Sequence, residues 1–254
     1  MKKSVSWKAV ILCPVIYIIV MGAANYYTHH RYKAIYSETL YLKVMLPFFV
    51  VLCVATLASW LFFGKKISPP KGTNKIPVYY LVFFIPLASV MVTSVMPRGG
   101  NNTGLITAFA VAVLVGIAEE LMFRRIVYAG LRQKMSSYDY KWPVAISASF
   151  FAVLHSVNVF AGMSLTSTAT QVIMTFFAGL FYALMYDYTG KIGLMIILHT
   201  LWDYVLLTDS FEMHSVFMGF IVMTVMAALS VIEFILIVIL IVRKELEIRK
   251  SGVL

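Results

Sequence analysis

Eight apolar segments alternate along the chain with short polar connections. A helix needs roughly 20 mostly apolar residues to cross the hydrocarbon core of a bilayer. The segments are Lys8–Ala24, Leu40–Phe63, Ile76–Met96, Gly104–Phe123, Val144–Phe160, Gln171–Tyr186, Ile192–Leu207 and Val216–Val242. Those that begin at Val144, Gln171 and Ile192 are short or interrupted by polar residues. The pattern predicts an all-α, polytopic transmembrane helical bundle of about eight spans.

Composition places the chain among integral membrane proteins. Of its 254 residues, 61% are hydrophobic and only 13% are charged, whereas soluble domains carry roughly 25% charged residues. The first apolar segment follows two lysines, but no clear small-residue cleavage site follows it, so we expect a retained helix rather than a signal peptide. Cys13 and Cys53 lie inside apolar segments, which argues against a disulfide framework.

Basic residues gather on one side of the predicted bundle. The formal net charge is +10, but Lys and Arg lie between apolar segments rather than in one patch, so we expect contact with anionic lipid and no nucleic-acid partner. With eight spans, 17 of these residues fall on the side of the two termini and four on the other side. Cytoplasmic loops carry such an excess. We therefore expect cytoplasmic termini in a multi-pass protein of the cell membrane, and the compact layout points to a bacterial plasma membrane.

The first polar cluster, Glu119, Glu120 and Arg124, closes the fourth apolar segment at its expected cytoplasmic end. Glu120 and Arg124 are four residues apart, so they share a helix face in the order that favours an ion pair. Glu119 points about 100° away and lacks that partner. One acid is then structural while the other stays free for chemistry. Alternatively, these charges only cap a helix at the membrane interface.

Two histidines interrupt the later apolar segments. His155 follows Phe151 by one turn, and His199 precedes Asp203 by one turn, so each pair shares a helix face. Each histidine alone is compatible with a structural hydrogen bond between or along helices. Together with Glu119, however, they are expected at similar depths in the cytoplasmic half of three helices. Ionisable groups inside a membrane usually face a bundle interior or a wet cavity and mark function. We therefore expect one shared site, either a metal site or a glutamate-activated water site.

Three short stretches in this order resemble one family. "EELMFR" fits an EExxxR motif, "FAVLH" fits FxxxH, and "HTLWD" fits HxxxN with aspartate in place of the usual asparagine. They resemble the CPBP intramembrane proteases, also called the CAAX protease and bacteriocin-processing or Abi family, over roughly Gly104 to Leu207. Members trim prenylated C-terminal tripeptides, process peptides or provide bacteriocin self-immunity. The resemblance implies a helical membrane core that hydrolyses a peptide or membrane-protein substrate.

The resemblance also implies a role for each motif residue. Glu119 would be the general base, His155 would help to polarise the attacking water, and Glu120 with Arg124 would hold the first motif in shape. His199 and Asp203 would stabilise the oxyanion, or would join Glu119 and His155 around a divalent metal such as zinc. An ionised aspartate would repel an oxyanion. Asp203 must therefore be protonated, orient His199, or ligate a metal.

These motifs divide the chain into three regions and leave three functional hypotheses. The regions are 1–103 with three spans, a catalytic core at 104–207, and 208–254 with a last span and a basic tail. The first hypothesis is an intramembrane protease that acts near the cytoplasmic side. The second is a non-catalytic membrane scaffold of the same family, serving as an immunity or regulatory factor. The third is an ion-coupled transporter, against which the lack of a visible internal repeat counts. Substrate identity and oligomeric state stay open.

Overall fold

Helices account for nearly all of the residues that the computed structural model describes. It describes residues 6–73, 75–95, 103–135, 139–209 and 216–250, and these residues contain no β-strand. The α-helices are α1 (Trp7–Tyr32), α2 (Thr39–Phe62), α3 (Val78–Val95), α4 (Thr103–Glu119), α5 (Ala129–Lys134), α6 (Lys141–Ser156), α7 (Leu165–Thr189), α8 (Ile192–Asp209) and α9 (Val216–Lys250). The 3₁₀-helices η1 (Gly64–Lys66) and η4 (Val157–Ala161) and the π-helix η2 (Glu120–Tyr128) complete them. The predicted all-α membrane bundle is confirmed.

Six helical stretches in the described residues are long and apolar enough to cross a membrane. They are Trp7–Tyr32, Thr39–Lys66, Thr103–Lys134, Lys141–Ala161, Leu165–Thr189 and Gly219–Lys250. Shorter apolar helices cover Val78–Val92 and Ile192–Thr208. Each of the eight predicted segments therefore coincides with an apolar helix. The number of helices that cross the bilayer, and the side on which the termini lie, stay predictions.

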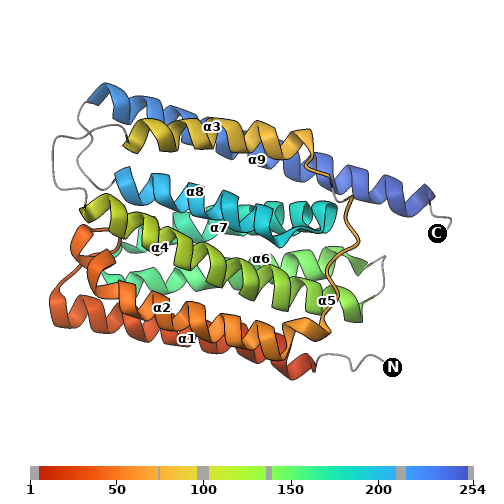
Figure 1. Ribbon diagram of the computed structural model, residues 1–254, viewed down its shortest axis with the longest axis horizontal. Helices are drawn as coiled ribbons and strands as arrows, with labels where there is room; N and C mark the ends of the chain where they lie inside the picture. Colours follow the sequence, from red (N-terminus) through yellow and green to blue (C-terminus); the bar gives the residue numbers. More distant parts are fainter. Residues whose placement is uncertain (1–5, 74, 96–102, 136–138, 210–215, 251–254) are drawn as a thin grey trace.

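The helices lie nearly parallel in layers (Figure 1). α1 and α2 form one outer layer and α3 and α9 the other, with α4, α6, α7 and α8 between them. The start of α1 and the end of α9 lie at the same end of the bundle, which is called the termini end below. The connection between α1 and α2 lies at the opposite end.

α1 extends beyond the predicted segment, and a polar residue in this extension is satisfied inside the protein. α1 continues past Ala24 to Tyr32. Its buried Asn25 donates to the Val157 carbonyl at 3.1 Å and accepts from the Tyr41 hydroxyl at 2.7 Å. Burying a polar group is costly only when it lacks such partners. The prediction that the first span ends at Ala24 is therefore wrong.

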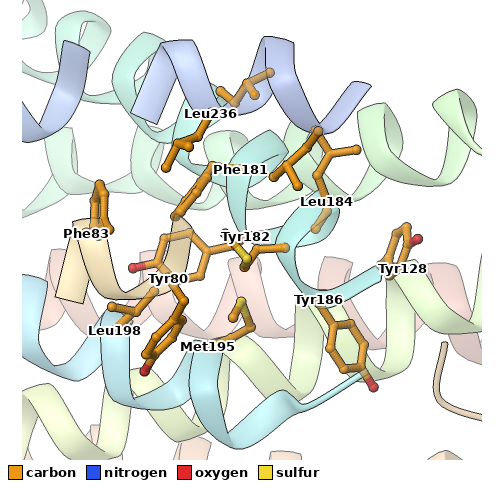
Figure 2. Packing of buried hydrophobic residues seen from close by; sticks show 14 of the residues in the cluster. Tyr80, Phe83, Tyr128, Phe181, Tyr182, Leu184, Tyr186, Met195, Leu198 and Leu236 are labelled. Carbon is orange, nitrogen blue, oxygen red and sulfur yellow. The ribbon is translucent and has the colours of Figure 1, made fainter. Parts of the chain in front are cut away.

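Two buried aromatic and aliphatic clusters hold the layers together. One joins α3, α7, α8 and α9, and the other joins α1, α2, α4 and α6. Figure 2 shows the first, where Phe83 of α3 and Phe181 of α7 meet beside Leu198 of α8. The Phe83 and Phe181 ring centroids are 5.1 Å apart. Aromatic pairs at this spacing add about 0.5–1.5 kcal/mol beyond area burial.

A glycine sets the distance between the two central helices that carry the polar motifs. A Cβ atom on Gly116 of α4 would lie 2.6 Å from the Thr200 hydroxyl and 3.3 Å from the Ile196 carbonyl oxygen of α8. Small residues allow helix backbones to approach closely in membranes. Gly116 therefore permits the contact that brings Glu119 and Glu120 toward α8.

Replacement of Gly116 by valine should destabilise the bundle. The new side chain overlaps the α8 backbone, and overpacking of this kind costs about 1–3 kcal/mol. Gly193→Val is the matched control, because nothing lies within 4 Å of a Cβ atom at that position of α8. Thermal unfolding of the detergent-solubilised protein should show a lower Tm for Gly116→Val than for Gly193→Val. Equal Tm values would contradict the close approach.

Candidate active site

The first motif lies in the middle of a continuous helical stretch. α4 ends at Glu119, and the π-helix η2 continues from Glu120 into α5 without a break. Glu119 is thus near the midpoint of Thr103–Lys134, a 32-residue candidate span. The expectation that the helix ends at this motif is wrong, whereas the position of the motif relative to the bilayer stays a prediction. A π-helical turn inside an α-helix frequently occurs at functional sites.

The helix continues because Arg124 is neutralised inside the protein. The predicted pair is present: Arg124 Nε lies 3.3 Å from Glu120 Oε2, and both side chains are fully buried. The two atoms are not aligned for a hydrogen bond, so the contact is an ion pair only. The guanidinium carbon lies 4.2 Å from the Phe151 ring centroid and 5.2 Å from that of Tyr182. Arg124 is thus buried among protein groups rather than exposed at the bundle surface, and its depth in the bilayer stays a prediction.

Three carboxylates surround the imidazole of His199. Its Nδ1 atom lies 2.8 Å from Glu120 Oε1, and its Nε2 atom lies 3.4 Å from Asp203 Oδ2 and 3.8 Å from Glu119 Oε2. A carboxylate only accepts hydrogen bonds, so Nδ1 carries a proton that it donates to Glu120. Glu120 therefore links Arg124 to His199. Helix spacing does not predict this contact, because the two residues are 79 positions apart.

His155 is oriented by a hydrogen bond to the preceding turn of its own helix. Its Nδ1 atom lies 2.8 Å from the Phe151 carbonyl oxygen in the preceding turn. Because a carbonyl oxygen can only accept, Nδ1 carries the proton, and Nε2 of the neutral ring is left as an acceptor. The rings of Phe151 and His155 pack edge to face with centroids 4.9 Å apart. Phe151 thus supports His155 on one side and Arg124 on the other.

One cavity of about 410 Å³ joins these side chains, and Glu119, His155, His199 and Asp203 all line it. Most of its wall is apolar. Its polar end is formed by three hydrogen-bonded residues, Tyr36, Asn158 and Gln171. Tyr36 lies in the connection between α1 and α2, opposite the termini end. The cavity therefore extends away from the termini, and the half of the membrane in which the site lies stays a prediction.

Glu233 of α9 is a cavity residue that the sequence analysis missed. It is 6% exposed and lines the same cavity as the three motifs. It is also the only acidic residue in the last apolar segment, Val216–Val242. An isolated acid in such a run was the signal that could have identified it.

The predicted metal set was Glu119, His155, His199 and Asp203. Among the residues that the structure describes, no group of three or more His, Cys, Asp or Glu side chains is arranged to hold a metal ion. His155 and His199 each direct Nδ1 at an acceptor within the protein. A divalent metal therefore stays a prediction, and no reaction step is assigned to it.

The basic residues that follow the first motif have partners within the chain. Arg125 donates to the Ile67 carbonyl at 2.7 Å, and Lys134 lies 5.3 Å from the Trp7 ring centroid. Ion pairs join Arg132 to Asp187 at 3.7 Å and Lys141 to Glu245 at 2.8 Å. These contacts fix the termini end of the bundle around η2 and α5.

Removal of one partner of the buried ion pair should lower the free energy of unfolding more than removal of both partners. Glu120→Leu leaves the Arg124 charge uncompensated, and such losses cost about 3–5 kcal/mol. The double variant Glu120→Leu/Arg124→Met should recover most of that stability, because a buried pair replaced by apolar groups is often neutral. Denaturant titration in mixed micelles measures both. A double variant no more stable than Glu120→Leu would contradict this account.

Part of the chain that forms this site matches a known protein family. No curated protein and no solved structure matches the chain. Residues 101–205 match the family described as Type II CAAX prenyl endopeptidase Rce1-like. The matched segment contains all six predicted motif residues, and the CAAX proteases are peptide hydrolases of membranes. The resemblance inferred from the three motifs is thereby confirmed over residues 101–205, and this segment of the multi-pass membrane protein is similar to the Rce1-like CAAX proteases.

Proposed function

We propose that this protein is an intramembrane endopeptidase that hydrolyses a peptide bond with a water activated by Glu119. The observation that carries the proposal is the shared cavity, in which Glu119, His155, His199 and Asp203 meet inside an apolar bundle. Hydrocarbon contains too little water for hydrolysis, and only a protein-lined polar cavity supplies it at this depth. The substrate class is a peptide precursor or a lipid-modified or membrane protein.

Glu119 is suited to be the general base because it has no ion-pair partner as close as that of Glu120. Its Oε2 atom lies 3.8 Å from His199 Nε2, beyond hydrogen-bond distance, while Glu120 holds both Arg124 and His199. A positioned base contributes about 10²–10⁴-fold to rate. Glu119 takes a proton from water as the water oxygen attacks the carbonyl carbon. It returns that proton to the amine as the C–N bond breaks.

The histidines act on the water and on the oxyanion. His155 Nε2 is an acceptor, so it orients the water by accepting its second hydrogen. His199 Nε2 lies between Glu119 and Asp203 and, when protonated, donates to the oxygen on which negative charge develops. Glu120 and Asp203 orient the ring and stabilise its positive charge. Of the three roles considered for Asp203, its position favours the orienting one.

Loss of cavity residues should abolish cleavage without unfolding the protein. We expect Glu119→Gln, His155→Ala and His199→Ala each to lower the rate of peptide cleavage in proteoliposomes by at least about 10²-fold. Arg243→Gln is the control, because this residue lies over the Tyr188 ring and pairs with Glu247, outside the cavity. Cleavage that persists in folded Glu119→Gln would overturn the proposal.

A metal chelator separates two mechanisms in the same assay. Activity that survives prolonged chelation supports the glutamate-water mechanism, and loss that a divalent metal restores assigns the water to a metal instead. An inert wild-type protein on a broad peptide panel, with a cell phenotype that survives all three substitutions, would favour the non-catalytic scaffold.

Asp203 offers a test of the orienting role. Asp203→Asn should keep cleavage within about tenfold of wild type, because the amide oxygen still accepts a hydrogen bond from His199. Asp203→Leu removes the acceptor and should lower kcat by about 10²-fold, the scale of losing one oxyanion-stabilising contact. Steady-state kinetics of the three proteins decides this. Equal rates for the Asn and Leu variants would remove Asp203 from the mechanism.

A further inference from the structure

Glu233 brings a carboxylate to the cavity from outside the matched segment. It lies on α9, is 6% exposed, and lines the cavity together with Ser230 one turn before it. Its Oε1 atom has no hydrogen-bond partner in the described part of the chain. No ion pair within 4.0 Å involves it there either, so Arg124, which acts on it electrostatically, is not its direct partner. An acid at this position is left available to a ligand.

The cost of burying this acid makes a purely structural role a poor explanation. A charged residue at the centre of a membrane helix is costly unless it has a partner, and such residues usually mark a functional site. Glu120 is offset by Arg124 and His199, whereas Glu233 has no such contact in the described residues. The other α9 residues that line the cavity are Met223, Met226, Ala227 and Ser230, and none of them carries a charge.

The charge of the cavity wall indicates what kind of group it accepts. Its ionisable lining consists of three carboxylates, Glu119, Asp203 and Glu233, two imidazoles, and tyrosines. No lysine or arginine lines it within the described residues, although the chain carries a net charge of +10. Arg124 is buried behind the wall and is already paired with Glu120. A free terminal carboxylate would be repelled here, and a cation would be attracted.

We propose that Glu233 is a specificity-determining residue that binds a lysine or arginine side chain of the peptide substrate. This inference rests on the proposed function for the identity of the substrate as a peptide. The ammonium or guanidinium group supplies the ion-pair partner that Glu233 lacks, and the apolar wall contacts the long aliphatic stem of the same side chain. The attraction between the bound cation and the Glu233 carboxylate offsets the cost of desolvating both groups only when the two are in direct contact.

Peptide binding by the full-length protein in nanodiscs tests this inference. The Glu119→Gln background prevents turnover during the measurement. The probes are fluorescent apolar peptides that differ at one scanned position, which holds lysine, norleucine or glutamate. We expect lysine at one position to bind at least about tenfold more tightly than norleucine, which corresponds to about 1.4 kcal/mol. Glu233→Gln should reduce that ratio to below about twofold, and Glu233→Lys should make the glutamate peptide the preferred ligand.

Glu247→Gln is the matched control, because it removes one negative charge from α9 at an exposed position outside this cavity. It should leave the lysine preference unchanged. A lysine preference that is absent, or that survives Glu233→Gln, overturns the inference. Cleavage is assayed separately with Glu119 restored. If the peptides are never cleaved but Glu233 still selects lysine, the proposed peptide hydrolysis is rejected and the proposed lysine-binding site is retained.

Discussion

The buried charge of Arg124 is the constraint on which the centre of the structure depends. A guanidinium that is 0% exposed inside a membrane protein requires an anion and a surrounding surface that tolerates its charge. Glu120 supplies the anion, and the faces of Phe151 and Tyr182 supply the surface. Because Glu120 also holds His199, this one charge ties η2 to α6, α7 and α8. The position of His199 therefore follows from an ion pair that takes no direct part in the proposed reaction.

The two adjacent glutamates have the same side chain but lie in different surroundings. Glu120 is committed to Arg124 and His199, so its two oxygens are occupied. Glu119 faces the cavity and has only a longer contact with His199. A pair of identical side chains on one helix can thus provide a structural anion and a base, because successive positions on a helix point about 100° apart.

Local spacing predicted the features that depend on one helix, and it did not predict those that depend on two. The i,i+4 relations gave the contacts of Glu120 with Arg124 and of His199 with Asp203, because helix geometry alone fixes them. The apolar segments gave the helical bundle for the same reason. The contact between Glu120 and His199 depends on how α8 packs against α4, including the close approach at Gly116. The helix was expected to end at the first motif because Arg124 was counted as an interfacial charge, whereas Glu120 pairs with it and the Phe151 ring packs against it inside the protein.

Glu233 of α9 lines the cavity but belongs to none of the sequence motifs. The matched family segment stops at residue 205, yet the cavity wall continues onto α9, where Glu233 lies. Residues that activate water need fixed positions relative to one another, so they recur as motifs at set spacings. A residue that binds a substrate side chain needs only to face the cavity and to carry the right charge. Such a residue produces no motif, and its trace in the sequence is a single acid where every neighbour is suited to lipid. The cost of retaining that acid in an apolar helix therefore supports the proposal that Glu233 binds a cationic group in the cavity.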